Sequence, residues 1–251
     1  MTHHALVTGA GTGIGAAITR HLASLNLRVT LLGRRPEPIQ TLAEELGGAA
    51  LAIAADVSDR AGIDAAFCQA REHHGGIDIL INCAGQAPTA PFQKTSEEQW
   101  QSVFASNVTG VFNCTQAALP DMMEQGWGRI INIASTASLK GYPYVSAYCA
   151  SKHAVLGLTR ALALELAKTG VTANALCPGF TDTDIIKTAG SDIVTKTGRA
   201  ADEAMAHFTS TNPQGRLIQP HEVAGTVAWL IDRACDSING QAIAIDGGET
   251  A

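Results

Sequence analysis

Short apolar runs, rich in β-branched residues, alternate with longer amphipathic stretches along almost the whole chain. The strand-like runs cover 5–8, 28–32, 49–54, 77–81, 128–134, 171–176 and 241–245. The helix-like stretches cover 14–25, 37–46, 60–73, 97–125, 146–169 and 221–231. Regular alternation predicts a parallel sheet with helices on both faces, and continuously apolar strands are typical of a sheet buried on both sides. We therefore predict an α/β fold with a doubly wound, seven-stranded parallel sheet.

One stretch interrupts this alternation. Residues 180–219 lie between the sixth and seventh strand-like runs, with no strand-like run of their own and only a weak helical pattern near 200–209. Long insertions after the carboxyl end of a strand are where ligand-covering segments tend to occur. We expect a substrate-binding lid at about 180–219 within a single domain that spans 1–251. The alternative is a surface excursion without a function.

Composition narrows the functional classes. A chain of 251 residues with 46% hydrophobic content can bury a sizeable core, and a net charge of −6 without a basic cluster argues against a nucleic-acid partner. Six cysteines are scattered singly, without the spacing of a metal site or a disulfide framework. The sequence shows neither a signal-peptide pattern nor a long apolar span. We expect a cytoplasmic protein with no metal, no nucleic acid and no membrane association.

A glycine-rich turn follows the first strand-like run and opens a helix. Gly9 permits the tight turn, Gly13 lets the backbone approach a pyrophosphate, and Gly15 allows close packing of the helix on the sheet. The helix N-terminus then presents free N–H groups and the positive end of its dipole to the anion. This pattern predicts a Rossmann-type dinucleotide site whose first turn consists of Gly9, Thr12, Gly13, Ile14 and Gly15.

The end of the second strand-like run indicates which dinucleotide binds. A site specific for NAD places an acidic residue there for the ribose 2′-hydroxyl, whereas an arginine accommodates a 2′-phosphate. Here Gly33 takes the place of the acid, and Arg34 follows it. We therefore predict that NADP(H) is preferred, with NAD(H) as the alternative.

Three polar residues in the middle of the chain form a candidate proton-transfer site. Ser135 precedes Tyr148 by thirteen positions, and Lys152 lies one helical turn after Tyr148. Residues four apart share a helix face, and a neighbouring cation lowers the pKa of a phenol. We expect Lys152 to tune Tyr148 as a general acid–base group, with Ser135 holding the oxygen that receives the proton. On its own, such a pair also fits a buried tyrosine beside a solvated lysine.

Taken together, the glycine turn and the Ser135, Tyr148 and Lys152 spacing resemble the short-chain dehydrogenase/reductase family over essentially the whole chain. Other matching motifs are Asp56-Val57, Asn82-Cys-Ala-Gly85, Asn107, Pro178-Gly179 with Thr183, and Asp246-Gly-Gly248. Cys83 departs from the family pattern, which has a second Asn there. The resemblance implies additional cofactor contacts from Asp56, Val57, Asn82, Ala84, Gly85, Pro178, Gly179, Thr181 and Thr183.

The resemblance also implies a mechanism. Tyr148 would donate the proton to a carbonyl oxygen or remove it from an alcohol. Lys152 would lower the pKa of Tyr148 and bind the nicotinamide ribose, and Ser135 would orient the substrate oxygen. Asn107 would support a proton relay, and no metal would be needed.

The substrate is implied only as a class. Residues 165–183 resemble the matching segment of aromatic polyketide ketoreductases, and 3-oxoacyl carrier-protein and acetoacetyl-CoA reductases are similar almost as closely. These resemblances imply NADP(H)-dependent reduction of a ketone to a secondary alcohol, on a 3-oxoacyl thioester or polyketide-type carbonyl. The alternatives are a catabolic NAD(P)-dependent hydroxyacyl-CoA or secondary alcohol dehydrogenase, and a cofactor-binding regulatory protein without turnover.

Expectations about partners follow from the same resemblance. The substrate would be a small molecule or an acyl thioester, in one version carried by an acyl carrier protein. Candidate docking residues for the carrier are Arg129, Lys140, Lys168 and Lys187. Candidate pocket residues are Tyr142, Tyr144, Phe180, Phe208 and His207. We expect a homotetramer that forms through the helices at 97–125 and 146–169 and through the last strand.

Overall fold

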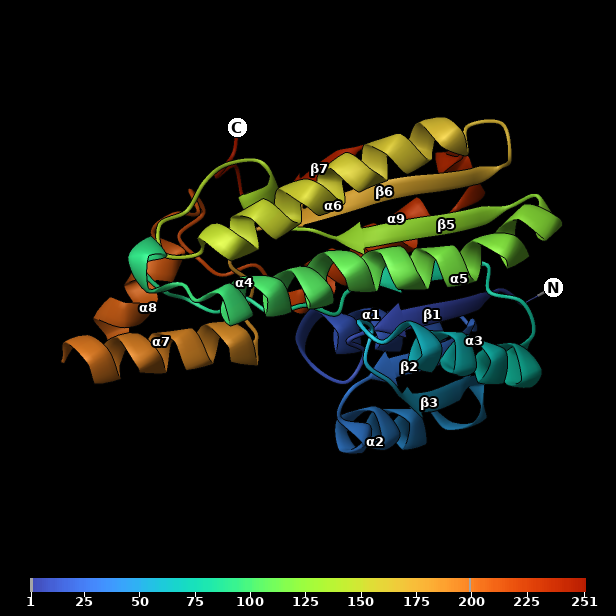
Figure 1. The fold of residues 1–251 in the computed structure, drawn as a ribbon, viewed down its shortest axis with the longest axis horizontal. Coiled ribbons are helices and arrows are strands. Elements are labelled where there is room, and N and C mark those ends of the chain that lie inside the picture. Colours follow the sequence, from blue (N-terminus) through green and yellow to red (C-terminus); the bar gives the residue numbers. More distant parts are fainter. Residues whose placement is uncertain (1, 199) are drawn as a thin grey trace.

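Seven parallel strands form one sheet at the centre of the molecule (Figure 1). The computed structural model describes residues 2–198 and 200–251, apart from the side chains at positions 185, 192, 193, 196, 197, 204 and 207. The strand order is β3-β2-β1-β4-β5-β6-β7, which confirms the doubly wound arrangement. The strands are β1 (His4–Thr8), β2 (Arg28–Gly33), β3 (Ala50–Ala54), β4 (Ile79–Asn82), β5 (Gly128–Ile133), β6 (Val171–Pro178) and β7 (Ala242–Ile245).

Helices cover both faces of this sheet. On one face lie α1 (Gly13–Ser24), α2 (Pro36–Leu46) and α9 (Pro220–Leu230), and on the other lie α3 (Arg60–His74), α5 (Gly110–Gln125) and α6 (Ser146–Glu165). Short helical turns are η1 (Gly47–Ala49), η2 (Phe92–Lys94), η4 (Thr136–Ser138) and η5 (Arg233–Cys235). In the part of the chain that the structure describes, no helix is long and apolar enough to cross a membrane.

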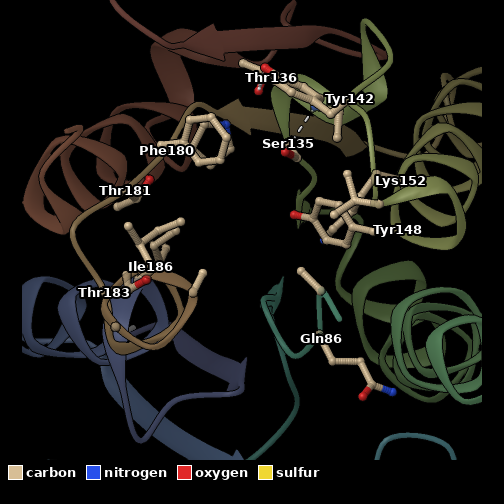
Figure 2. A pocket seen from close by; sticks show the side chains of 18 of the residues that line it. Gln86, Ser135, Thr136, Tyr142, Tyr148, Lys152, Phe180, Thr181, Thr183 and Ile186 are labelled. Carbon is tan, nitrogen blue, oxygen red and sulfur yellow. Dashed lines mark hydrogen bonds between the residues drawn. The ribbon is translucent and has the colours of Figure 1, made fainter. Parts of the chain in front are cut away.

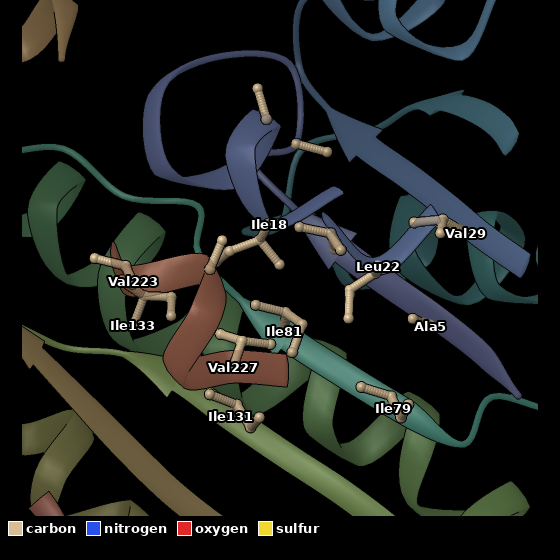
Figure 3. Close-up of a cluster of buried hydrophobic side chains, with 14 of the residues drawn as sticks. Ala5, Ile18, Leu22, Val29, Ile79, Ile81, Ile131, Ile133, Val223 and Val227 are labelled. Carbon is tan, nitrogen blue, oxygen red and sulfur yellow. The ribbon is translucent and has the colours of Figure 1, made fainter. Parts of the chain in front are cut away.

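The apolar strands supply a core to each face. Successive side chains of a strand point to opposite faces, so Ala5 joins the cluster under α1 and α9, and its neighbour Leu6 joins the cluster under α3 and α5. Figure 3 shows the first cluster, in which Ile18 of α1 and Val227 of α9 meet over Ile81 of β4. Burial of apolar side chains on both faces is the reason why the strand sequences lack polar alternation.

The segment at 180–219 is more helical than its sequence indicates. It contains α7 (Asp184–Thr197) and α8 (Ala201–Thr209), which lie beyond the carboxyl ends of the strands (Figure 1). The prediction of a weak helical pattern confined to 200–209 was therefore wrong for α7. A Cβ atom at Gly190 would lie 2.9 Å from Met205 Sδ, so this glycine allows α7 and α8 to pack closely. Glycine is a poor helix former, and its presence hides the helix from sequence patterns.

The long helix at 97–125 contains a local irregularity. The structure divides it into α4 (Glu97–Phe104), a π-helical turn η3 (Ala105–Thr109) and α5. Asn107 lies in that turn and is almost fully buried. Single π turns inside α-helices occur frequently at functional sites, and this one places Asn107 against the loop that follows β4.

Candidate active site

A cavity of about 700 Å³ opens at the carboxyl edge of the sheet (Figure 2). The loops after β1, β4, β5 and β6 form its walls together with the segment that carries α7 and α8. In an open parallel sheet, ligands bind in this position. Ser135, Tyr148 and Lys152 all line the cavity, so the three polar residues that the sequence singled out lie together.

Ser135 and Tyr148 come from different elements and meet through their side chains. Ser135 follows β5, and its Oγ accepts a hydrogen bond from the Ala137 N–H at 3.1 Å. Tyr148 lies in the first turn of α6. Burial raises the pKa of Tyr148 to about 12, although a hydrogen bond with the Ser135 side chain lowers it in part. The phenol is therefore protonated throughout the neutral range.

Lys152 lies one turn further along α6, and its side chain is buried. Its Nζ donates a hydrogen bond to the Ile133 carbonyl oxygen at 2.7 Å and lies 5.6 Å from the centroid of the Tyr148 ring. Desolvation lowers the pKa of Lys152 to about 8. Burial dominates the pKa of the phenol here, and the ammonium faces a carbonyl oxygen. That Lys152 lowers the pKa of Tyr148 during the reaction stays a prediction.

Asn107 connects the π turn to the loop after β4 and to α6. Its Oδ1 accepts from the Gln86 N–H at 2.9 Å, and its Nδ2 donates to the Gln86 carbonyl at 3.0 Å and to Ser151 Oγ at 3.0 Å. Asn107 lies behind the cavity wall, outside the residues that line the cavity. Its part in a proton relay stays a prediction.

The glycine turn forms a backbone cradle. Gly9 and Gly13 have φ angles of +65° and +53°, a region that glycine adopts readily. A Cβ atom at Gly15 would overlap the Gly9 carbonyl oxygen, and one at Gly9 would lie 2.9 Å from Ala84 Cα. Thr12 is the N-cap residue of α1 and makes no side-chain cap hydrogen bond. These features fit an anionic pyrophosphate at the N-terminus of α1.

The last residue of β6 and the turn that follows it form another part of the cavity wall. Pro178, Gly179, Thr181 and Thr183 line the cavity, as predicted for the nicotinamide side. Thr181 Oγ1 donates to the Gly179 carbonyl at 2.9 Å. A Cβ atom at Gly13 would lie 3.1 Å from Thr183 Cγ2, so the start of the lid touches the glycine turn.

The predicted adenosine contacts lie at the same sheet edge but beyond the cavity. Arg34 Nη1 is 3.9 Å from Asp56 Oδ2, and both side chains are exposed. A Cβ atom at Gly33 would lie 3.1 Å from Ile39 Cγ2, so a larger residue there would require the Ile39 side chain to shift by a few tenths of an ångström. The Val57 side chain is buried, and its carbonyl oxygen accepts a hydrogen bond from Asn113 Nδ2 at 3.0 Å.

The Asn82 side chain points into the protein. Its Nδ2 donates to Asn132 Oδ1 at 2.8 Å and to Thr115 Oγ1 at 3.2 Å, inside the protein and outside the cavity lining. The Asn82 side chain therefore joins β4 to β5, and a contact between Asn82 and the cofactor stays a prediction. Ala84 and Gly85, two and three positions later, do line the cavity.

Cys83 takes the position between Asn82 and Ala84, lines the cavity and packs against the core cluster under α1 and α9. Burial raises the pKa of Cys83 to about 11, so it is a neutral thiol there. Its backbone N–H donates to Thr8 Oγ1 at 3.0 Å, as does that of Ala84. The departure from the family pattern therefore leaves the turn after β4 intact.

Sequence reasoning missed several residues of the substrate side. They lie in three segments: the loop after β4, the stretch between β5 and α6, and the lid. They are Gln86, Ala87, Thr89, Ala90, Pro91, Thr136, Ala137, Pro143, Val145, Asp184, Ile186, Ala189 and Thr211. The loop 86–91 carried a usable signal, because two prolines follow β4 without a helix pattern. The other lining residues belong to no motif that would identify them in the sequence.

Most of the predicted aromatic pocket residues lie in the cavity wall. Tyr142, Tyr144, Phe180 and Phe208 all line the cavity, whereas the side chain of His207 lies outside the described part of the chain.

Arg129 was wrong as a docking residue for a carrier protein. It is 1% exposed and pairs with Asp236. It also lies at the start of β5, which is the sheet edge opposite the cavity.

Comparisons with known proteins agree over the whole chain. Residues 3–193 match the model of the short chain dehydrogenases. A putative ketoacyl reductase of Streptomyces coelicolor is 39% identical over 249 residues, which cover 97% of this chain and 95% of that protein. A D-beta-hydroxybutyrate dehydrogenase of Rhizobium meliloti is 34% identical over 257 residues, which cover 100% of both.

A solved structure extends the agreement to three dimensions. The crystal structure of a variant actinorhodin polyketide ketoreductase with NADPH superimposes with a TM-score of 0.95 at 38% identity, covering 99% of this chain and 97% of that one. Among the described residues of this chain, no group of three or more His, Cys, Asp or Glu side chains is placed to hold a metal ion. Fold, site geometry and sequence identity together assign the chain to the short-chain dehydrogenase family.

Proposed function

We propose that this protein is an NADPH-dependent ketoreductase that converts a ketone into a secondary alcohol, with a 3-oxoacyl thioester or polyketide-type carbonyl as substrate. The observation that carries the proposal is the meeting of Ser135, Tyr148 and Lys152 in one cavity beside the glycine turn. The similarity to a ketoacyl reductase and to a polyketide ketoreductase solved with NADPH supports the same reaction.

The residues of the glycine turn would hold the cofactor pyrophosphate, and Arg34 would bind the 2′-phosphate. Asp56 and the backbone of Val57 would contact the adenine, while the turn from Pro178 to Thr183 would contact the nicotinamide. When bound, NADPH supplies the hydride. Arg34 has the charge for this task, and its pairing with Asp56 at 3.9 Å orients it toward the same edge.

Side chains of the protein would supply the proton that the reduction requires. The Ser135 hydroxyl would hold the carbonyl oxygen, and Tyr148 Oη would donate its proton to that oxygen as negative charge develops there. A phenol with a pKa near 12 stays protonated until it is needed, which suits reduction. The Lys152 ammonium would then stabilise the phenolate, and it would bind the nicotinamide ribose.

Tyr148→Phe tests this assignment. It removes only the acidic hydroxyl, so we expect ketone reduction to fall by roughly 10²–10⁴-fold, the usual contribution of a positioned general acid. The rate is followed at 340 nm with NADPH and a ketone, and NADPH binding is followed separately by fluorescence. NADPH affinity should stay within about twofold, because binding energy comes mainly from the rest of the site. A variant with the full wild-type rate would overturn the mechanism.

The dehydrogenase alternative has one specific observation in its favour, the 34% identity with D-beta-hydroxybutyrate dehydrogenase. It predicts faster oxidation of 3-hydroxybutyrate with NAD⁺ than reduction of acetoacetate with NADPH at neutral pH. Measurement of both directions with both cofactors decides between the two. A cofactor-binding regulatory role would predict no turnover in either direction, with NADPH binding intact.

The proposal also covers the extent of the catalytic unit, its location, its assembly and its partners. We propose that 1–251 is one catalytic unit, cytoplasmic and homotetrameric, in which 180–219 closes over a small-molecule or acyl-thioester substrate. For an acyl carrier protein, Lys140 and Lys187 remain as docking candidates, whereas Lys168 lies between α6 and β6, at the sheet edge opposite the cavity. Both remaining lysines have acidic partners, since Lys140 pairs with Glu249 and Lys187 with Asp182.

A further inference from the structure

The tail after β7 turns back into the wall of the active site. Asp246 fixes its shape, because its carboxylate accepts hydrogen bonds from the N–H groups of Gly248 and Thr250 at 2.9 Å. Glu249 projects from this turn, and its side chain is only 2% exposed. Burial of a charged group costs free energy unless it is paired, so the partners of this carboxylate indicate its purpose.

Two side chains from the loop before α6 hold Glu249. Lys140 Nζ forms an ion pair with Glu249 Oε1 at 3.0 Å, and Tyr142 Oη donates a hydrogen bond to the same oxygen at 2.5 Å. Tyr142 Oη also lies 2.7 Å from Thr136 Oγ1. A phenol has one proton, so Thr136 donates in return. Burial and the Glu249 carboxylate raise the pKa of Tyr142 well above its usual range, which keeps the phenol a donor.

This phenol anchors a row of aromatic rings. Tyr142 meets Phe180 edge-on with ring centroids 5.8 Å apart, and Phe180 meets Phe208 of α8 in the same way at 5.1 Å. All three residues line the cavity, and Figure 2 shows Tyr142 and Phe180 on the side of the cavity across from Gln86. Edge-to-face contacts depend on ring orientation. A change in the orientation of the Tyr142 ring would therefore alter its contact with Phe180 and, through Phe180, the contact with Phe208 in the lid.

The second carboxylate oxygen of Glu249 has a different environment from the first. Glu249 Oε2 is buried and has no hydrogen-bond partner among the described residues. A Cβ atom at Gly179 would lie 3.3 Å from it, so the oxygen packs against the turn that borders the nicotinamide side. Unsatisfied buried polar atoms are rare in proteins. Here the other oxygen of the same carboxylate is held by Tyr142 and Lys140.

We propose that Glu249 is a positioning residue that determines substrate specificity. By holding Tyr142 Oη it fixes the wall formed by Tyr142, Phe180 and Phe208, and the fixed wall favours ring-sized ketones over short open-chain ketones. The inference rests on the proposed ketoreductase function and adds to it a size preference that originates in the C-terminal tail.

The test compares Glu249→Ala with Glu249→Gln on two ketones, 2-tetralone and ethyl acetoacetate. Loss of the anchor in Glu249→Ala should raise KM for 2-tetralone about tenfold, equivalent to about 1.4 kcal/mol. Its kcat on 2-tetralone, and both constants on ethyl acetoacetate, should change by less than about threefold. Glu249→Gln keeps an oxygen acceptor for Tyr142 and should restore KM to within about threefold of wild type.

Thr250→Ala is the matched control. It removes a hydrogen bond to Asp246 in the same tail and leaves Tyr142 untouched, so the ratio of the two KM values should equal that of wild type. Tyr142→Phe removes the same hydrogen bond from the other side and should reproduce the shift of Glu249→Ala. This variant keeps the inference testable if Glu249→Ala fails to fold.

The outcomes separate the two proposals. A wild-type enzyme that reduces neither ketone with NADPH counts against the ketoreductase function. An active wild type whose KM ratio is unchanged in both Glu249→Ala and Tyr142→Phe overturns the role of Glu249 alone. That role is also overturned if Glu249→Ala raises KM for both ketones equally, or if Glu249→Gln behaves like alanine. NADPH affinity, measured by fluorescence, should stay at the wild-type value in every variant.

Discussion

At Lys152, desolvation sets a pH limit for the proposed reaction. Burial lowers the pKa of its ammonium to about 8, whereas Tyr148 keeps its proton up to a pKa of about 12. The cation that would stabilise the Tyr148 phenolate is therefore present below pH 8 and lost above it. In the neutral range the limiting group is the lysine and not the tyrosine.

We therefore expect kcat/KM for ketone reduction to be flat from about pH 6 to 7.5 and to fall as the pH rises through about 8, because the ammonium deprotonates. Steady-state rates with NADPH, taken at half-unit intervals, measure this profile. Lys152→Arg keeps its charge at high pH, so its rate should be lower but without the fall near pH 8. An unchanged fall in Lys152→Arg would assign the titration to another group.

Spacing along the sequence was sufficient to predict that Ser135, Tyr148 and Lys152 lie together in one cavity, but not the direction in which each side chain points. Ser135 and Tyr148 were predictable because a strand end and a helix start fix their positions relative to the sheet edge. The direction of the Asn82 side chain was not predictable from its motif, and its amide turns into the protein toward Asn132. The pKa of Tyr148 was also beyond the sequence, since it depends on burial.

At the scale of elements, the strands were predictable because their apolar runs are short and bounded by turns. Each observed strand begins and ends within two residues of its expected range. The helix expected at 146–169 ends at Glu165, and α7 was missed. A π turn such as η3 has no sequence signature, because it depends on how α4 and α5 pack against their neighbours.

At the sheet edge opposite the cavity, the turn between α6 and β6 packs against the turn between α5 and β5 through a single glycine. Gly170 lies between α6 and β6 with a φ of +78°, and a Cβ atom there would overlap the Gly126 carbonyl oxygen. We expect Gly170→Ala to lower the free energy of unfolding by about 2–4 kcal/mol, through backbone strain and steric overlap. Urea titration followed by circular dichroism measures the change.

Gly48→Ala serves as the comparison for that experiment. Gly48 has no heavy atom within 4 Å of a built Cβ and no positive φ. Its substitution should change stability by less than about 1 kcal/mol, and in the stabilising direction. Equal effects of the two substitutions would contradict the account of the Gly170 turn.

At the scale of the molecule, exposed apolar side chains on the two long helices favour the proposed tetramer. Leu164 of α6 is 82% exposed, and Phe112 and Met123 of α5 are nearly half exposed. Burial of a leucine side chain contributes about 1.5–3 kcal/mol. These positions coincide with the helices from which the sequence predicted assembly.

Sedimentation equilibrium should therefore give a mass of four times 26.1 kDa. Leu164→Glu should shift the protein toward smaller species, because it introduces a charge into the proposed contact. Leu25→Glu alters another exposed leucine, at the end of α1, and should leave the mass unchanged. A monomeric wild type would refute the assembly.

The contact between Tyr142 and Glu249 joins positions 107 residues apart, and it has a consequence for how the protein is made and handled. Synthesis proceeds from the N-terminus, so the ribosome completes the glycine turn and Tyr148 long before Glu249 emerges. The pocket wall that Tyr142 and Glu249 form together is therefore complete only after residue 249 has been added. For the same reason, affinity tags belong at the N-terminus, since an extension fused after Ala251 would lie close in sequence to Glu249.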